Sequence, residues 1–192
     1  MNLLVLGPQG AGKGTQAKRI SGEYGIPHVS TGDMFRAAIA AGTDLGREVE
    51  PLLASGTLVP DELTIALIRE RLGQDDAREG FILDGFPRNL EQAEALDRML
   101  TDTGRTLDAI LFFDIADEIG MERALSRAGI ENRPDDTREV IAKRLATYHA
   151  ETEPIVEHYR ASGKLVPLHA GRSIEQVWTE VSDALSHLQV TA

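Results

Sequence analysis

The chain of 192 residues carries 20 Lys and Arg against 31 Asp and Glu, a formal net charge of −11, and 42% of its residues are hydrophobic. This composition is typical of one globular domain with a sizeable core, and its acidity argues against a partner nucleic acid. The absence of cysteine excludes disulfides, thiolate-ligated metal centres and thiol catalysis. The first residues lack a basic segment and no apolar run reaches membrane-spanning length, so we expect a cytoplasmic protein with no membrane partner.

Three short apolar runs are continuous rather than alternating, at residues 3–6, 81–83 and 109–113. Continuous runs of this length are typical of parallel strands that are buried on both faces of a sheet. Two weaker candidates, 26–30 and 164–168, each contain one proline and are therefore expected at the flanks of the sheet.

Helical patterns fill the intervals between these strands. In the last of them, apolar residues recur every three or four positions, and Ser173-x-x-Gln176 forms a capping box at its start. Asp136-x-x-Glu139 is expected to open another helix in the same way, and Pro154 should bend or interrupt that helix. The expected helices cover residues 13–24, 32–55, 61–73, 89–103, 117–127, 137–161 and 174–188.

Strands that alternate with helices in this way predict an α/β fold, a doubly wound parallel sheet of five strands. Ligands of such folds bind beyond the carboxyl ends of the strands. The segments that directly follow the strands are therefore the place to expect functional residues.

A glycine-rich loop, Gly-Pro-Gln-Gly-Ala-Gly-Lys-Gly-Thr at residues 7–15, follows the first strand and leads into a helix. Its glycines let backbone N–H groups turn inward around an anion, and Lys13 adds a positive charge for the phosphates of a nucleotide. The alternative is an ordinary turn with a surface lysine, which the position between strand and helix disfavours.

A magnesium ion would accompany such phosphates, but this loop departs from the strict pattern. That pattern has Ser or Thr directly after the lysine, whereas here Gly14 stands before Thr15. We therefore expect Mg²⁺ to be held mainly by phosphate oxygens and water, with Asp84 nearby at the end of the third strand. The alternative for Asp84 is a carboxylate that only caps its loop.

Four segments, taken together and in this order, resemble the adenylate kinase family. They span nearly the whole chain and are far more specific than a phosphate loop alone. The resemblance implies a P-loop kinase that passes the γ-phosphoryl group of ATP, bound with Mg²⁺, to AMP and so forms two ADP. The matching segments are Gly10 to Thr15, Ser30 to Arg36, Gly56 to Asp61, and Asp84 to Arg88 together with Gln92.

For the AMP side, the resemblance implies a set of contacts drawn from several loops. Gln92 has an alternative, because Asn89-x-x-Gln92 has the spacing of a capping box, and Thr31 could simply cap the helix that follows. In related UMP/CMP kinases these two positions differ, so the pair favours AMP. The expected AMP-binding residues are Thr31, Arg36, Thr57, Leu58, Val59, Gly85, Phe86, Pro87, Arg88, Gln92, Arg133 and Arg144.

Four arginines, Arg123, Arg127, Arg133 and Arg144, surround one short Gly- and Pro-containing segment. Scattered arginines usually form a solvated charged face, but phosphoryl transfer concentrates negative charge that fixed guanidinium groups can balance. The resemblance implies that the ATP-binding residues are Gly10, Ala11, Gly12, Lys13, Gly14, Thr15, Arg123, Arg127 and Arg172. It implies that the catalytic residues are Lys13, Arg88, Arg123, Arg133 and Arg144.

The resemblance also implies how the chain is divided. We expect a single P-loop kinase domain over residues 1–192, with a core at 1–29, 60–125 and 137–192, an AMP-binding helical insertion at 30–59 and a short lid at 126–136. So short a lid leaves no structural zinc. The family suggests a monomer, and the five histidines, which show no convincing pairing with an acid, are expected to be surface or structural residues.

Three other functions remain open from the sequence. A kinase for a different nucleoside monophosphate would use the same loop. A P-loop GTPase switch is disfavoured because the sequence lacks the Asn-Lys-x-Asp motif of guanine recognition. A nucleotide sensor without catalysis would not need paired arginines on the acceptor side.

Overall fold

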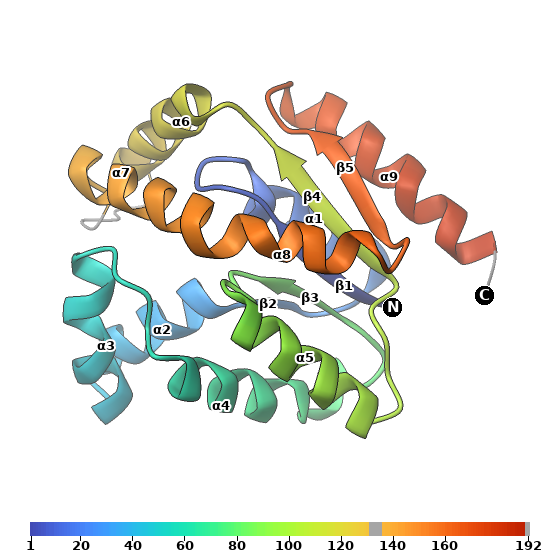
Figure 1. The fold of residues 1–192 in the computed structure, drawn as a ribbon, viewed down its shortest axis with the longest axis horizontal. Helices are drawn as coiled ribbons and strands as arrows, with labels where there is room; N and C mark the ends of the chain where they lie inside the picture. The colour runs from blue at the N-terminus through green and yellow to red at the C-terminus, as the bar shows by residue number, and fades with distance from the viewer. Residues whose placement is uncertain (131–135, 191–192) are drawn as a thin grey trace.

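The computed structural model describes residues 1–130 and 136–190. Its centre is one five-stranded sheet in the order β2-β3-β1-β4-β5, with every neighbouring pair parallel (Figure 1). The predicted fold class is confirmed, and the two strands expected at the flanks are the two edges of the sheet. The strands are β1 (Asn2–Leu6), β2 (His28–Ser30), β3 (Phe81–Asp84), β4 (Ala109–Asp114) and β5 (Leu165–His169).

Helices cover both faces of the sheet, as continuous apolar strands require. The helical segments are α1 (Lys13–Tyr24), α2 (Thr31–Ala40), α3 (Asp44–Ala54), α4 (Asp61–Leu72), the 3-10 turn η1 (Asp75–Ala77), α5 (Leu90–Asp102), α6 (Asp117–Ile130), α7 (Arg138–Thr147), the π-helical turn η2 (Tyr148–Thr152), α8 (Glu153–Arg160) and α9 (Ile174–Val190). In Figure 1 the pairs α2/α3 and α6/α7 both stand on the left of the view, away from the N-terminus.

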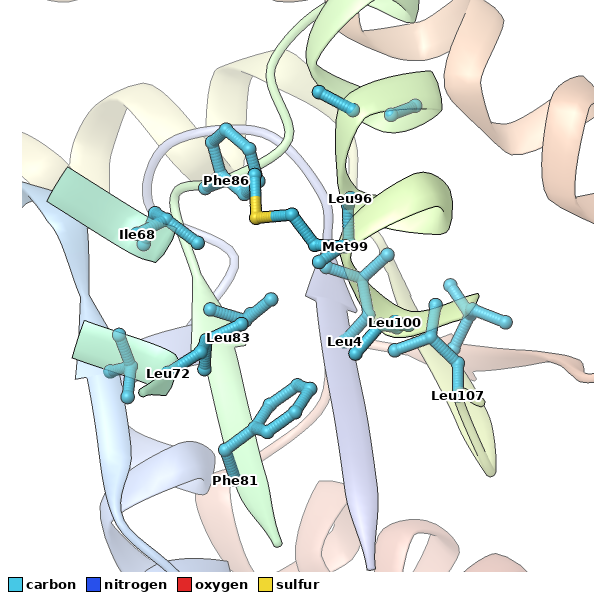
Figure 2. Close-up of a cluster of buried hydrophobic side chains, with 14 of the residues drawn as sticks. Leu4, Ile68, Leu72, Phe81, Leu83, Phe86, Leu96, Met99, Leu100 and Leu107 are labelled. Atoms are coloured by element: carbon cyan, nitrogen blue, oxygen red, sulfur yellow. The ribbon is translucent and has the colours of Figure 1, made fainter. Parts of the chain in front are cut away.

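Two hydrophobic cores lie against opposite faces of the sheet. On one face Leu4 and Leu83 pack with Leu96 of α5 and residues of α4 and α8, as Figure 2 shows for part of the cluster. On the other face Leu3 and its neighbours pack with α1 and α9, and the single tryptophan lies partly buried there. Alternate strand residues thus enter different cores, which is why the strand sequences show no polar alternation.

The predicted helix over 32–55 is wrong in its middle, because the structure has two helices there. Gly42 adopts φ +63°, a left-handed conformation that ends α2, and the Thr43 hydroxyl accepts a hydrogen bond from the Gly46 N–H to cap α3. The predicted interruption at Pro154 is confirmed: the chain leaves regular α-helix at η2, shortly before Pro154, whose ring nitrogen donates no hydrogen bond.

Of the two predicted capping boxes, one is confirmed. Ser173 and Gln176 exchange hydrogen bonds of 3.3 and 3.2 Å between side chains and backbone. Asp136 does not open the next helix, because Thr137 is its N-cap and accepts from the Val140 N–H. The Asp136 carboxylate instead accepts from Arg127 and Arg144, and the neighbouring Thr137 caps the helix.

The expectation that no histidine pairs with an acid is wrong. His149 lies 2.9 Å from both Glu153 and Asp117, which raises the pKa of its imidazole through these hydrogen bonds. His158 lies 2.9 Å from Asp97. Most of these pairs join positions more than thirty residues apart, so only the folded chain reveals them.

None of the helices in the described part of the chain is long and apolar enough to cross a membrane. Within residues 1–130 and 136–190, no three side chains of His, Cys, Asp or Glu form a group that could hold a metal ion by themselves.

Candidate functional site

A cavity of about 840 Å³ opens at the carboxyl ends of β1 and β3, where a doubly wound fold places its ligands. The phosphate loop, helix α2 and the turn after β3 line the cavity, and α6 and α7 add Arg123, Arg127 and Arg144. All predicted site residues line this cavity except Phe86 and Arg133. Segments far apart in the sequence therefore meet in one space, as a site for two ligands requires.

The two exceptions have different reasons. Phe86 is 1% exposed and packs in the core beneath the cavity, among Ile68 and Met99 (Figure 2). Its side chain therefore supports the turn from below, and only its backbone remains a predicted AMP contact. Arg133 lies outside the described residues, as do the other residues of the predicted lid between 131 and 135.

The phosphate loop closes on its own lysine. The Lys13 ammonium donates to the carbonyl oxygens of Gly7 at 2.7 Å and Pro8 at 2.9 Å, so the loop curls over the start of α1. Burial lowers the pKa of Lys13 to about 8. The charge of Asp84 opposes that shift, whereas nearby arginines add to it. A buried ammonium group close to other cations is suited to bind an anion.

Two glycines of the loop have similar backbone angles but different surroundings, which gives a matched test. A Cβ at Gly10 (φ +81°) would lie 2.0 Å from the carbonyl oxygen of Gly120, whereas a Cβ at Gly12 (φ +84°) meets nothing within 4 Å. Gly12→Ala should therefore cost only the strain of a left-handed residue, about 1–2 kcal/mol. Gly10→Ala should cost at least about 2 kcal/mol more, because backbone must move away from backbone.

Urea unfolding of both variants measures this difference. Equal midpoints for Gly10→Ala and Gly12→Ala would contradict the close approach between the loop and α6.

Asp84 is positioned to serve phosphate chemistry. Its carboxylate lies 3.3 Å from His28 and lines the cavity beside the loop. Burial alone would raise its pKa, but the hydrogen bond from His28 and the charge of Lys13 together hold the pKa of Asp84 below its usual value. One ionised carboxylate facing a phosphate cradle fits Mg²⁺, which keeps several waters and takes few protein ligands.

On the opposite side of the cavity, two side chains converge on the turn after β3. The Thr31 hydroxyl and the Arg88 Nε both donate to the Gly85 carbonyl, each at 2.8 Å. Gly85 has φ +79°, and a Cβ there would lie 2.7 Å from the Thr31 hydroxyl oxygen. Thr31 is not the helix cap, because Ser30 caps α2 by accepting from the Asp33 N–H. The Thr31 hydroxyl instead fixes the turn that presents Arg88.

Arg88 is a partly buried guanidinium of the site. Burial, together with repulsion from Arg144 and Arg36, lowers its pKa against the opposing charge of Asp84. Within the described part of the chain, its terminal nitrogens make no hydrogen bond, and the residue lines the cavity. The Arg88 guanidinium is thus held at its Nε, and its terminal nitrogens remain available to bind a ligand in the cavity.

The Gln92 side chain does not complete the capping box that the sequence offers as its alternative role. Asn89 caps α5 by accepting from the Gln92 N–H at 2.9 Å, which is half of a capping box. The Gln92 amide does not return to Asn89 but accepts from the Arg88 N–H at 2.8 Å and donates to Asp61 at 2.6 Å. It is 1% exposed yet lines the cavity, so its contact with adenine remains a prediction.

Arg123 of α6 has definite partners. Arg123 donates to the carbonyl oxygens of Ala170, Gly171 and Arg172 at 2.6–3.2 Å, which joins α6 to the loop between β5 and α9. This brings Arg172 to the same wall of the cavity as the phosphate loop. The predicted spacing of Arg123 and Arg127 along one helix face holds, since both line the cavity.

Asp136 is a functional candidate that sequence reasoning missed. Its side chain is fully buried, accepts from Arg127 at 2.7 Å and from Arg144 at 2.8 Å, and accepts also from the Gln9 amide at 2.8 Å. It therefore bridges the phosphate loop, α6 and α7. The available signal was an acid between two arginine positions, which the capping-box interpretation obscured.

Similarity to known proteins identifies the family of this chain. The model of the family described as "Adenylate kinase" matches residues 5–164. Adenylate kinases of Thermobifida fusca, Parvibaculum lavamentivorans and Fervidobacterium nodosum are 48%, 46% and 44% identical to the chain. These alignments cover 96%, 96% and 92% of this chain and 98%, 92% and 94% of the relatives. The chain therefore belongs to the adenylate kinase family, whose members are nucleoside monophosphate kinases.

Proposed function

We propose that the protein transfers the γ-phosphoryl group of MgATP to AMP, reversibly, giving two ADP. The observation that carries the proposal is a single cavity in which a phosphate loop faces an arginine-bearing turn, with Lys13, Arg88, Arg127 and Arg144 all on its lining. In a chain of net charge −11, so many cations around one space indicate ligands with several negative charges.

The acceptor needs no general base. The phosphate of AMP is already anionic near neutral pH, unlike the hydroxyl of a sugar or serine. Arg88 and Arg36 would instead hold it in line with the donor, and positioning of this kind supplies much of the rate of phosphoryl transfer. Thr31 and Gly85 fix the orientation of Arg88 for this task.

On the donor side, Lys13 and the loop N–H groups would bind the β and γ phosphates of ATP. Mg²⁺ bound with ATP supplies Lewis-acid stabilisation of phosphate charge, and Asp84 would hold it through water. Arg123 and Arg172 line the wall where the adenosine part of ATP is expected. Arg127 and Arg144 would neutralise charge that develops during transfer, with Arg133 as a further predicted contributor.

The predicted lid, residues 126–136, would exclude water, which otherwise competes with AMP for the phosphoryl group. The position of Asp136 supports phosphate binding beside this lid, because its carboxylate lies between Arg127 and Arg144, where an anionic phosphate oxygen would fit. We also propose that the protein is a cytoplasmic monomer of one domain with the insertion at 30–59, which size-exclusion chromatography with light scattering can test.

A coupled assay that offers AMP, CMP, UMP and GMP in turn, with MgATP as donor, tests the proposed reaction. We expect AMP to be the preferred acceptor and ADP the only product formed from both substrates. Preference for CMP or UMP over AMP would identify a different monophosphate kinase. The absence of phosphoryl exchange would contradict catalysis altogether.

A further inference from the structure

The end of the insertion lies directly against α7. The Lys143 ammonium donates to the Ser55 carbonyl at 2.9 Å and to the Thr57 hydroxyl at 2.7 Å. The Ser55 and Thr57 hydroxyls lie 2.9 Å apart, so the three groups form one small network. The next residue of α7, Arg144, donates to the Leu53 carbonyl at 2.9 Å. Two successive residues of α7 thus bind the same short stretch of the insertion.

The approach between these segments is tight. Gly56 has φ +68°, and a Cβ there would lie 3.0 Å from the Val140 Cγ1 and 3.3 Å from the Arg144 Cγ. The turn at Gly56 therefore sits on α7 without room for a side chain. The contacts of Lys143 with Ser55 and Thr57 are therefore part of a closely packed interface between the insertion and α7.

The insertion is otherwise a separate unit of packing. Its own buried cluster contains Phe35, Val49 and Val59, with partly buried leucines of α4 against it, and is distinct from the two cores on the sheet. A unit with its own small core can move relative to the sheet at low energetic cost, so its position depends on contacts such as those with α7.

We propose that Lys143 is a positioning residue that latches the insertion onto α7 and so holds Thr57, Leu58 and Val59 at the cavity wall where AMP is received. This rests on the proposed function. Lys143 is exposed and is not among the residues that line the cavity, so it acts through Thr57 and Ser55 and not on a nucleotide. The latch lies on the acceptor side only, which predicts an effect on AMP and not on ATP.

Lys143→Met removes the ammonium and keeps most of the apolar stem. Losing its hydrogen bonds should shift the insertion away from the receiving position and raise KM for AMP by about 3- to 10-fold, the usual effect of a modest hydrogen bond. KM for ATP and kcat at saturating AMP should stay within about 2-fold, and Tm within about 2 °C, because an exposed bond contributes little to global stability.

Lys164→Met is the matched control, since the Lys164 ammonium also donates to a backbone carbonyl, that of Leu107 at 2.7 Å, far from the cavity. This control should leave KM for AMP unchanged. Lys143→Arg, which keeps the charge and donors, should restore most of the affinity for AMP. Thr57→Val combined with Lys143→Met should raise KM no further than the larger single effect, because both remove the same contact.

Hydrogen exchange of the 43–60 backbone without nucleotide gives a second, activity-independent readout. The latch predicts faster exchange there in Lys143→Met than in the wild type or in Lys164→Met. An unchanged KM for AMP, or equal rises of KM for AMP and for ATP, would overturn the proposal. If the wild type fails to phosphorylate AMP, the proposed function falls, while unchanged exchange separately shows that no latch exists.

Discussion

Replacing Arg88 with alanine should lower kcat/KM for AMP by about 10³-fold, an effect of the size seen when a charge-stabilising donor is removed from a phosphoryl-transfer site. Arg88 is held at one edge by Gly85 and directs its remaining nitrogens into the cavity. Its removal deletes the group that binds the acceptor phosphate in the orientation for attack. Both the affinity for AMP and the rate of transfer should therefore fall.

The stability of the Arg88→Ala variant should change little. Burying a guanidinium among other cations is itself unfavourable, as the lowered pKa of Arg88 shows, so its loss offsets the lost hydrogen bond to Gly85. Arg98→Ala is the control, because Arg98 is exposed on α5 and pairs only loosely with Glu94 at 3.6 Å. Steady-state kinetics with varied AMP, alongside thermal unfolding, checks both expectations. Wild-type turnover in Arg88→Ala would remove Arg88 from the site.

Lys13→Met should lower kcat by about 10²- to 10³-fold, since the lysine supplies a point charge to the phosphate that leaves and the phosphate that is transferred. Methionine fills a similar volume without the charge. The loop would also lose the two hydrogen bonds from the ammonium to Gly7 and Pro8. Lys164→Met is the control, because the Lys164 ammonium also donates to a backbone carbonyl, that of Leu107, and does not line the cavity.

The pKa of Lys13 adds a pH signature to this prediction. In the ligand-free protein the pKa of Lys13 lies at about 8, and the negative phosphates of ATP raise it. Below that pKa the lysine is already charged and ATP binding needs no proton. Above it the lysine is neutral, so ATP binding takes up a proton and weakens as the pH rises. Calorimetry in two buffers of different ionisation enthalpy at a pH of about 9 measures the uptake.

Lys13→Met should show no such uptake by this group. An equal uptake in both proteins would assign the proton to another residue and contradict the lowered pKa of Lys13.

The parts that could be predicted from the sequence are local. The phosphate loop needs glycines and a lysine at fixed offsets, and the turn at Gly85 and Arg88 follows directly from a strand, so both are visible in a short segment. The sheet follows from apolar runs whose neighbours on both faces are helices. These features depend on backbone conformation and burial, which neighbouring residues largely determine.

What could not be predicted depends on partners distant in the sequence. Asp136 has a capping-box spacing, yet its carboxylate binds Arg127 and Gln9 and leaves the cap to Thr137. The pairs of His149 with Asp117 and of His158 with Asp97 join distant helical segments, and the lysine latch joins Lys143 to Ser55 across 88 positions. The break in the long predicted helix depended on Gly42 taking a left-handed conformation, which a periodic apolar pattern does not disclose.

The buried carboxylate of Asp136 changes how the pocket meets its ligands. The guanidinium groups of Arg127 and Arg144 are already paired with the Asp136 carboxylate. A phosphate that binds there would therefore replace this carboxylate as their partner and would not neutralise unpaired positive charge. Nucleotide binding then releases fewer solvent counter-ions from the pocket than the number of arginines suggests. Affinity for nucleotides should accordingly depend only weakly on ionic strength, and a rise in cellular salt would leave the pocket nearly as receptive as before.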